Sequence, residues 1–170
     1  LDISQNSLKS IPEEIYCLKK LEVLSLKENL LKSISKEIGN LKYLKSLDIS
    51  YNKIEEIPKE IGNLKYLKSL DISCNEIEEI PKEITYLEQI KKLNLEHKNL
   101  SILPFDIINM KQLELLKINN NQIIHLPHFI GKLENLKKLY LQNNKLETLS
   151  GINWNISSLE KIYIDGNLLL

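Results

Sequence analysis

The chain contains no arginine and no alanine, and valine occurs once, at Val23. The 23 basic residues are therefore all lysines, and 23 acidic residues balance them. Proteins that bind nucleic acids usually carry a basic stripe in which arginine contacts bases and phosphates. The composition therefore argues against a nucleic-acid partner.

Three further absences narrow the class of protein. No apolar run approaches the length of about 20 residues that a membrane helix needs, so we expect no membrane span. Only two cysteines occur, which leaves the redox compartment undecided. No arrangement of nucleophile, base and orienting group is visible, so we expect no catalytic residues, no enzyme activity and no cofactor.

What the chain does contain is a repeat. The letters "EIGNLKYLKSLDIS" run over residues 37–50 and again over residues 60–73, 23 positions later. The same step relates positions along the whole chain without an insertion or a deletion. It connects Asn6, Asn29, Asn52, Asn75, Lys98, Asn121, Asn144 and Asn167. A period of roughly 20 to 50 residues is typical of repeat architectures.

Each copy contains two apolar patterns. Leu24 and Leu26 alternate with exposed positions, as in a strand with one buried face. The apolar residues downstream are three or four positions apart, which is typical of turn or short 3₁₀ structure, at Leu31, Ile34, Ile38 and Leu41. One strand and one return segment make a coil that cannot bury its own apolar edge. We therefore expect stacked coils with neighbouring parallel strands.

The stretches "LEVLSLKENLLKSI" and "LKSLDISYNKIEEIPKEIGNL" resemble the leucine-rich repeat, LxxLxLxxNxLxxLPxxIxxL, in its 23-residue form. The resemblance implies an α/β repeat solenoid, a horseshoe with a concave parallel β-sheet and short turn or 3₁₀ segments on the convex side. It also implies an asparagine ladder and a role in protein binding. The wording "IPKEIGNLKYL" is similar to repeat proteins of bacteria, notably spirochaetes, and intracellular Ras-pathway scaffolds use a similar phrase.

The period predicts a single leucine-rich repeat domain over residues 1–170. It comprises a partial first coil and seven 23-residue repeats, the last one incomplete. The chain starts in mid-repeat at Leu1, without methionine, so we expect a fragment or a processed product. Neither end carries a polar cap over the apolar column. We expect the native protein to continue past both ends, or copies to associate through the uncapped ends.

The polar positions between the core leucines predict one open, concave face of the sheet. Its central column is acidic at first and becomes basic and aromatic towards the C-terminus. The residues that we predict to bind a partner protein there are Asp48, Tyr51, Asp71, His97, Lys117, Tyr140 and Tyr163. Tyrosine offers binding surfaces a large rigid area with a polar tip. The alternative is that Tyr140 and Tyr163 merely suit an exposed strand.

Cys74 and His97 occupy one column on neighbouring coils, which raises the alternative of a metal site or a Cys–His dyad. Zinc needs a third and a fourth ligand, and only Asp71 or Glu96 is placed near. A dyad needs an orienting group, and none is visible. We therefore expect a solvated cysteine beside a solvated histidine and no metal.

A second candidate surface is apolar and lies on the outer side of two adjacent coils. Its residues replace charged or polar ones of other coils, and they are Ile102, Phe105, Ile124 and Phe129. A contiguous apolar patch marks an interaction site. The alternative is that these side chains cover an imperfectly packed stretch of core.

Together these features predict a non-enzymatic protein-recognition module that binds a partner protein on its concave face. The resemblance implies a bacterial protein, secreted or at the cell surface, that meets host proteins. One alternative is an intracellular scaffold or regulator with the same fold. Another is the substrate-recognition part of a larger enzyme. The sequence leaves the localisation and the partner unnamed, because the fold hosts many functions.

Overall fold

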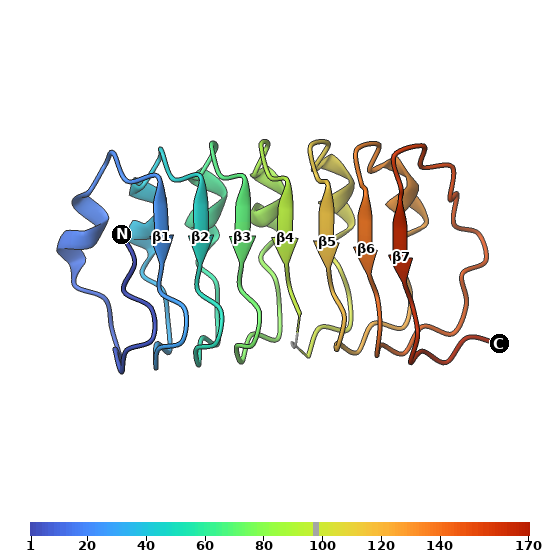
Figure 1. Ribbon diagram of the computed structural model, residues 1–170, viewed down its shortest axis with the longest axis horizontal. Coiled ribbons are helices and arrows are strands. Elements are labelled where there is room, and N and C mark those ends of the chain that lie inside the picture. Colours follow the sequence, from blue (N-terminus) through green and yellow to red (C-terminus); the bar gives the residue numbers. More distant parts are fainter. Residues whose placement is uncertain (97–98) are drawn as a thin grey trace.

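The computed structural model describes residues 1–96 and 99–170, and Figure 1 shows seven strands side by side with short helices behind them. The strands are β1 (Val23–Ser25), β2 (Ser46–Asp48), β3 (Ser69–Asp71), β4 (Lys92–Asn94), β5 (Leu115–Lys117), β6 (Lys138–Tyr140) and β7 (Lys161–Tyr163). The 3₁₀ helices are η1 (Glu13–Cys17), η2 (Lys36–Asn40), η3 (Lys59–Asn63), η4 (Lys82–Tyr86), η5 (Phe105–Asn109) and η6 (His128–Lys132). No helix among these residues is long and apolar enough to cross a membrane.

All neighbouring strands are parallel and pair in the order of the sequence, from β1 to β7. Each residue pairs with the residue one repeat later, as Leu47 does with Leu70 and Asp48 with Asp71. The first coil joins the sheet through a bridge between Asp2 and Ser25. The predicted repeat solenoid, with strands on one side and 3₁₀ segments on the other, is confirmed.

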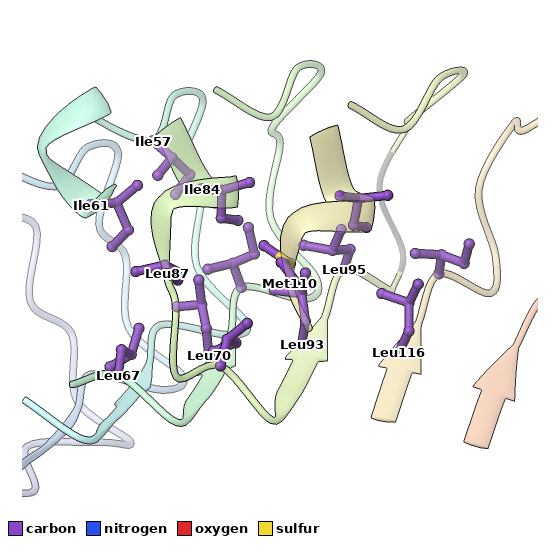
Figure 2. Packing of buried hydrophobic residues seen from close by; sticks show 14 of the residues in the cluster. Ile57, Ile61, Leu67, Leu70, Ile84, Leu87, Leu93, Leu95, Met110 and Leu116 are labelled. Carbon is purple, nitrogen blue, oxygen red and sulfur yellow. The ribbon is translucent and has the colours of Figure 1, made fainter. Parts of the chain in front are cut away.

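The core is one apolar column between the sheet and the 3₁₀ helices. In Figure 2, Leu70, Leu93 and Leu116 from successive strands point into the same space as Ile61 and Ile84 from the helices. Each of these side chains is at most 1% exposed. Burying one leucine or isoleucine contributes about 1.5–3 kcal/mol, so stacking supplies what a single coil lacks.

The predicted asparagine ladder links each coil to the one before it. The side-chain nitrogen of Asn52 donates to the carbonyl oxygens of Leu26 and Ile49, at 3.0 and 3.1 Å. Its oxygen accepts from the backbone N–H of Leu31 at 3.0 Å. The same pattern recurs at Asn29, Asn75, Asn121, Asn144 and Asn167. Lys98, which takes this place in one repeat, lies outside the described residues.

The residue before each ladder asparagine has a left-handed backbone. Tyr51 has a φ of 55° and Cys74 a φ of 51°, and Gly166 occupies the same position with a φ of 72°. This conformation is uncommon for residues other than glycine and costs of order 1 kcal/mol or more. Hydrogen bonds in the turn offset that cost. For example, the backbone N–H of Tyr51 donates to the carbonyl oxygen of Ser73 at 3.0 Å.

The last coil departs from the pattern. Its return segment around Trp154 contains no 3₁₀ helix, and the tryptophan is half-buried against the core. The backbone of this segment approaches the coil before it closely. A Cβ atom at Gly131 would lie 1.9 Å from the carbonyl oxygen of Asn153.

Candidate functional site

The strand residues that do not face the core form one continuous surface on the open side of the sheet, which we call the concave face. Strand pairing in equal register places their side chains in rows across the strands. The central row contains Ser25, Asp48, Asp71, Asn94, Lys117, Tyr140 and Tyr163. Five of the seven predicted binding residues therefore lie in one row. Two of them are on the adjacent strands β2 and β3, and three are on the adjacent strands β5 to β7.

The acidic end of this row is ordered by hydrogen bonds. Asp48 Oδ1 accepts from the backbone N–H of Ser50 at 2.9 Å and from its hydroxyl at 2.6 Å. Asp71 makes the same pair of bonds with Ser73, and its Oδ2 accepts from Asn94 Nδ2 at 2.9 Å. The two carboxylates are thus held in fixed positions on a partly exposed surface.

The other end of the row is a strip of stacked side chains, Lys117, Tyr140 and Tyr163. The tyrosine rings stack with their centroids 4.6 Å apart and their planes 15° from parallel. Lys117 Nζ lies 5.4 Å from the centroid of the Tyr140 ring, in a cation–π contact. The predicted contiguous aromatic strip exists, whereas its contact with a partner stays a prediction.

Tyr51 lies beside the central row, on the left-handed turn after β2, and its side chain is exposed. Its ring lies under the Lys27 ammonium, at 5.4 Å from the centroid. A hydrogen bond with the side chain of Cys74 raises the pKa of Tyr51, and the charge of the Cys74 thiolate raises it further. Tyr51 and Cys74, one repeat apart, are therefore linked through their side chains.

The alternative of a metal site falls partly outside the described residues, because His97 lies there. Among the residues that the structure describes, no group of three or more histidine, cysteine, aspartate and glutamate side chains could hold a metal ion. Whether Cys74 and His97 bind a metal stays untested, and our prediction remains that they do not.

Two buried oxygen atoms of the concave face lack a hydrogen-bond donor. Asn119 Oδ1 and Gln142 Oε1 have no partner among the described residues. They lie two positions after Lys117 and Tyr140, just beyond the ends of β5 and β6. A buried acceptor without a donor costs about 1–3 kcal/mol. Sequence reasoning missed this pair, since the same row holds serines, a lysine and a glutamate in other coils.

The second candidate surface is also formed. The rings of Phe105 and Phe129 meet edge to face at a centroid distance of 5.2 Å. Ile102 is 77% exposed, and Ile124 is also exposed. Lys132 Nζ lies 4.8 Å from the centroid of the Phe129 ring. Phe105 and Phe129 are both exposed, so the alternative that they only cover the core explains just part of their surface.

Two surface features outside the concave face were not predicted. Tyr43 and Tyr66 stack at 5.8 Å between the 3₁₀ helices and the following strands, and both are exposed. Their spacing of one repeat was a usable signal. A groove on the surface is lined by five glutamates, Glu55, Glu56, Glu76, Glu78 and Glu79. Acidic side chains alone identify no ligand, so we base the site on the concave face.

A pH-dependent contact lies at the edge where the strands begin. Lys91 and Lys137 bind the two carboxylate oxygens of Glu114, at 2.8 and 2.9 Å. The hydrogen bonds from Lys91 and then from Lys137 lower the pKa of Glu114 from 4.5 to about 2. The contact therefore stabilises the folded chain above pH 4.5, and its contribution is lost as the pH falls through about 2.

We expect a carboxyl titration of Glu114, followed by NMR, to have its midpoint near 2. Replacing one cation, in Lys137→Met, should raise the pKa of Glu114 towards 4.5. The matched control, Lys68→Met, removes a lysine of the same row that has no ion pair among the described residues. A midpoint near 4.5 in the unchanged protein would contradict the ion pairs.

The sequence matches two family models. One, described as leucine-rich repeat region, matches residues 31–99. The other, described as leucine rich repeat, matches residues 1–54 and 111–169. No curated protein sequence matches the chain.

Several solved structures are similar over nearly all of the chain. A leucine-rich repeat protein of Leptospira interrogans is 36% identical, with a TM-score of 0.80, over 100% of this chain and 49% of that one. An internalin of Listeria monocytogenes is 23% identical, with a TM-score of 0.86, over 98% and 48%, a similarity that shows the fold alone. A plant peptide hormone receptor, solved in complex with RGF2, is 36% identical, with a TM-score of 0.87, over 98% and 28%. The chain spans half or less of each of these proteins.

Proposed function

Because the chain belongs to the leucine-rich repeat family, we propose that it recognises a partner protein through its concave face. The observation that supports this most is the ordered strip of Lys117, Tyr140 and Tyr163. Stacked aromatic rings offer a large area that loses little conformational entropy on binding. Members of this family generally act as protein-interaction modules.

We further propose a bacterial protein that is exported or surface-exposed and meets host proteins. The similarity to a Leptospira protein and the repeat sequence "IPKEIGNLKYL" support this origin. The chain is equally identical, at 36%, to a plant peptide hormone receptor. That similarity supports a role in recognition but does not favour a bacterial origin over another. The intracellular scaffold and the recognition part of a larger enzyme remain the alternatives, and the full-length sequence distinguishes all three.

The experiment that tests recognition is a selection of protein fragments displayed on phage against the immobilised chain. The recovered binders are then measured against Tyr140→Ala and Tyr163→Ala. Each substitution should weaken binding by more than about 1 kcal/mol, because aromatic residues at the centre of an interface carry most of its energy.

The matched control is the other stacked pair, changed in Tyr43→Ala and Tyr66→Ala. These rings lie outside the concave face, so their loss should leave the affinity unchanged. Binders that respond to the control pair and ignore Tyr140 and Tyr163 would place recognition elsewhere. Thermal unfolding of all four variants checks that the fold is retained.

A further inference from the structure

The charge of the concave face changes sign along the sheet. Asp48 and Asp71 lie on β2 and β3, whereas Lys117, Lys138 and Lys161 lie on β5, β6 and β7. Two residues run against this trend at the margins, Lys27 before the acidic end and Asp165 after the basic end. Lys27 Nζ lies 3.3 Å from a carboxylate oxygen of Glu28, which offsets its charge. Lys92 on β4 stands at the transition.

The lysines of the basic end are available to a partner. Lys117, Lys138 and Lys161 form no ion pair with any described residue. At the neighbouring edge, by contrast, Lys91 and Lys137 both form ion pairs with Glu114. The structure thus pairs the lysines beside the face and leaves those on it unpaired.

The acidic end also keeps its charge. The hydrogen bonds to Asp48 come from a backbone N–H and a serine hydroxyl, which are neutral donors. Asp71 likewise receives its bonds from Ser73 and Asn94. These donors fix the carboxylates without cancelling their charge, so the negative potential remains at the surface.

The distance between the two ends suits an extended segment of protein. Neighbouring strands are about 4.8 Å apart, so β2 and β7 are separated by about 24 Å. An extended chain advances about 3.3 Å per residue, so about seven residues bridge that distance. A segment lying across the strands would contact first the acidic end, then Asn94 on β4, and then the stacked tyrosines.

We propose that the concave face binds an extended protein segment in one orientation, with cationic side chains over β2 and β3 and acidic side chains over β5 to β7. This rests on the proposed function and deepens it by naming the charge order of the partner. The opposite orientation brings lysine against lysine and carboxylate against carboxylate, and like charges facing each other are costly. The tyrosine strip adds an aromatic subsite for the acidic half of the segment.

Two synthetic peptides of identical composition test the charge order. The block peptide carries lysines at one end and glutamates at the other, separated by about three serine, tyrosine and glycine residues, because β3 and β5 are about 10 Å apart. The alternating peptide carries the same charges in alternation. By fluorescence anisotropy at low salt, the block peptide should bind at least about tenfold more tightly. The difference should shrink as salt screens the charges.

Neutral variants locate the effect. Asp48→Asn with Asp71→Asn keeps hydrogen-bond acceptors for the serines but removes the charge, and it should abolish the preference. Lys138→Gln with Lys161→Gln should do the same from the other end. The matched control, Lys36→Gln with Lys59→Gln, removes two exposed lysines one repeat apart at the 3₁₀ helices and should leave the preference unchanged.

Reversal gives the strictest test. In Lys138→Glu with Lys161→Glu both ends of the face become acidic, so a peptide with lysines at both ends should now bind best. Equal affinities for the block and alternating peptides, or no peptide binding at low salt, would overturn the proposed orientation. The result is separate from the proposed function, because dependence on Tyr140 and Tyr163 is measured with selected proteins.

Discussion

Asn52→Ala should lower the free energy of unfolding by about 4 kcal/mol, since each buried group left without its partner costs about 1–3 kcal/mol. The substitution removes the acceptor of the Leu31 N–H and the donor shared by the carbonyls of Leu26 and Ile49. These groups belong to two coils, and Asn52 is only 8% exposed, so water cannot replace the lost bonds. The defect therefore lies at the junction of coils and weakens the whole stack.

Urea unfolding followed by circular dichroism measures this effect. Asn40→Ala is the matched control, because Asn40 ends η2, is exposed and makes no hydrogen bond through its side chain among the described residues. We expect the control to change the free energy of unfolding by less than about 0.5 kcal/mol. Similar losses for Asn52 and Asn40 would show that the ladder bonds add little.

Gly62→Ala should destabilise the chain by about 2 kcal/mol, the usual scale for overpacking. Two effects compete at this position in η3. Alanine restricts the unfolded chain more than glycine does, which favours folding by about 0.4–1 kcal/mol. Its Cβ atom, however, would lie 2.6 Å from the backbone carbonyl oxygen of Glu83 in the next coil. Backbone of a neighbouring coil cannot move aside without disturbing the stack, so the clash outweighs the entropy.

Thr85→Ala provides the comparison, because Thr85 occupies the corresponding position one repeat later. That change only removes a side chain, with one hydrogen bond to the carbonyl oxygen of Lys82 at 2.7 Å. Its cost should stay near 1 kcal/mol, as is roughly typical of one such bond. A stabilising Gly62→Ala substitution would mean that the coils have room to separate.

The periodic features of the fold could be predicted from the sequence. An unbroken step of 23 residues indicates the register, because a slip by one residue would turn core leucines such as Leu47 and Leu70 away from the column. The resemblance to the leucine-rich repeat implied the ladder, and its physical reason is that an amide side chain both donates to and accepts from a turn. Rows across the sheet, and with them the stack of Tyr140 and Tyr163, follow from register alone.

Features that depend on backbone detail could not be predicted. The left-handed turn is occupied by Tyr51 and Cys74, two residue types that do not favour it, although Gly166 at the same position was a signal. The contact of Tyr51 with Cys74 follows from that turn. The tight approach at Gly62 depends on the spacing of coils at the 3₁₀ helices, which the apolar pattern leaves undetermined.

The site could be predicted as a surface but not as an interaction. Core positions repeat because each coil must stack on the next, whereas the exposed row varies freely from Asp48 to Tyr163. That variation carries the information about the partner, and here it gives the charge order of the concave face.

Lysine footprinting with a selected binder tests recognition by the concave face most directly. The chain contains 23 lysines and no arginine, and the lysines lie both on the strands and on the 3₁₀ helices. Acetylation of lysines, read by mass spectrometry, therefore reports which side of the solenoid a binder covers. Binding should protect Lys117, Lys138 and Lys161, while the exposed lysines that begin the 3₁₀ helices react as before, at Lys36, Lys59 and Lys82. Protection of the helix lysines, with the three strand lysines still reactive, would contradict the proposal that the concave face is the binding surface.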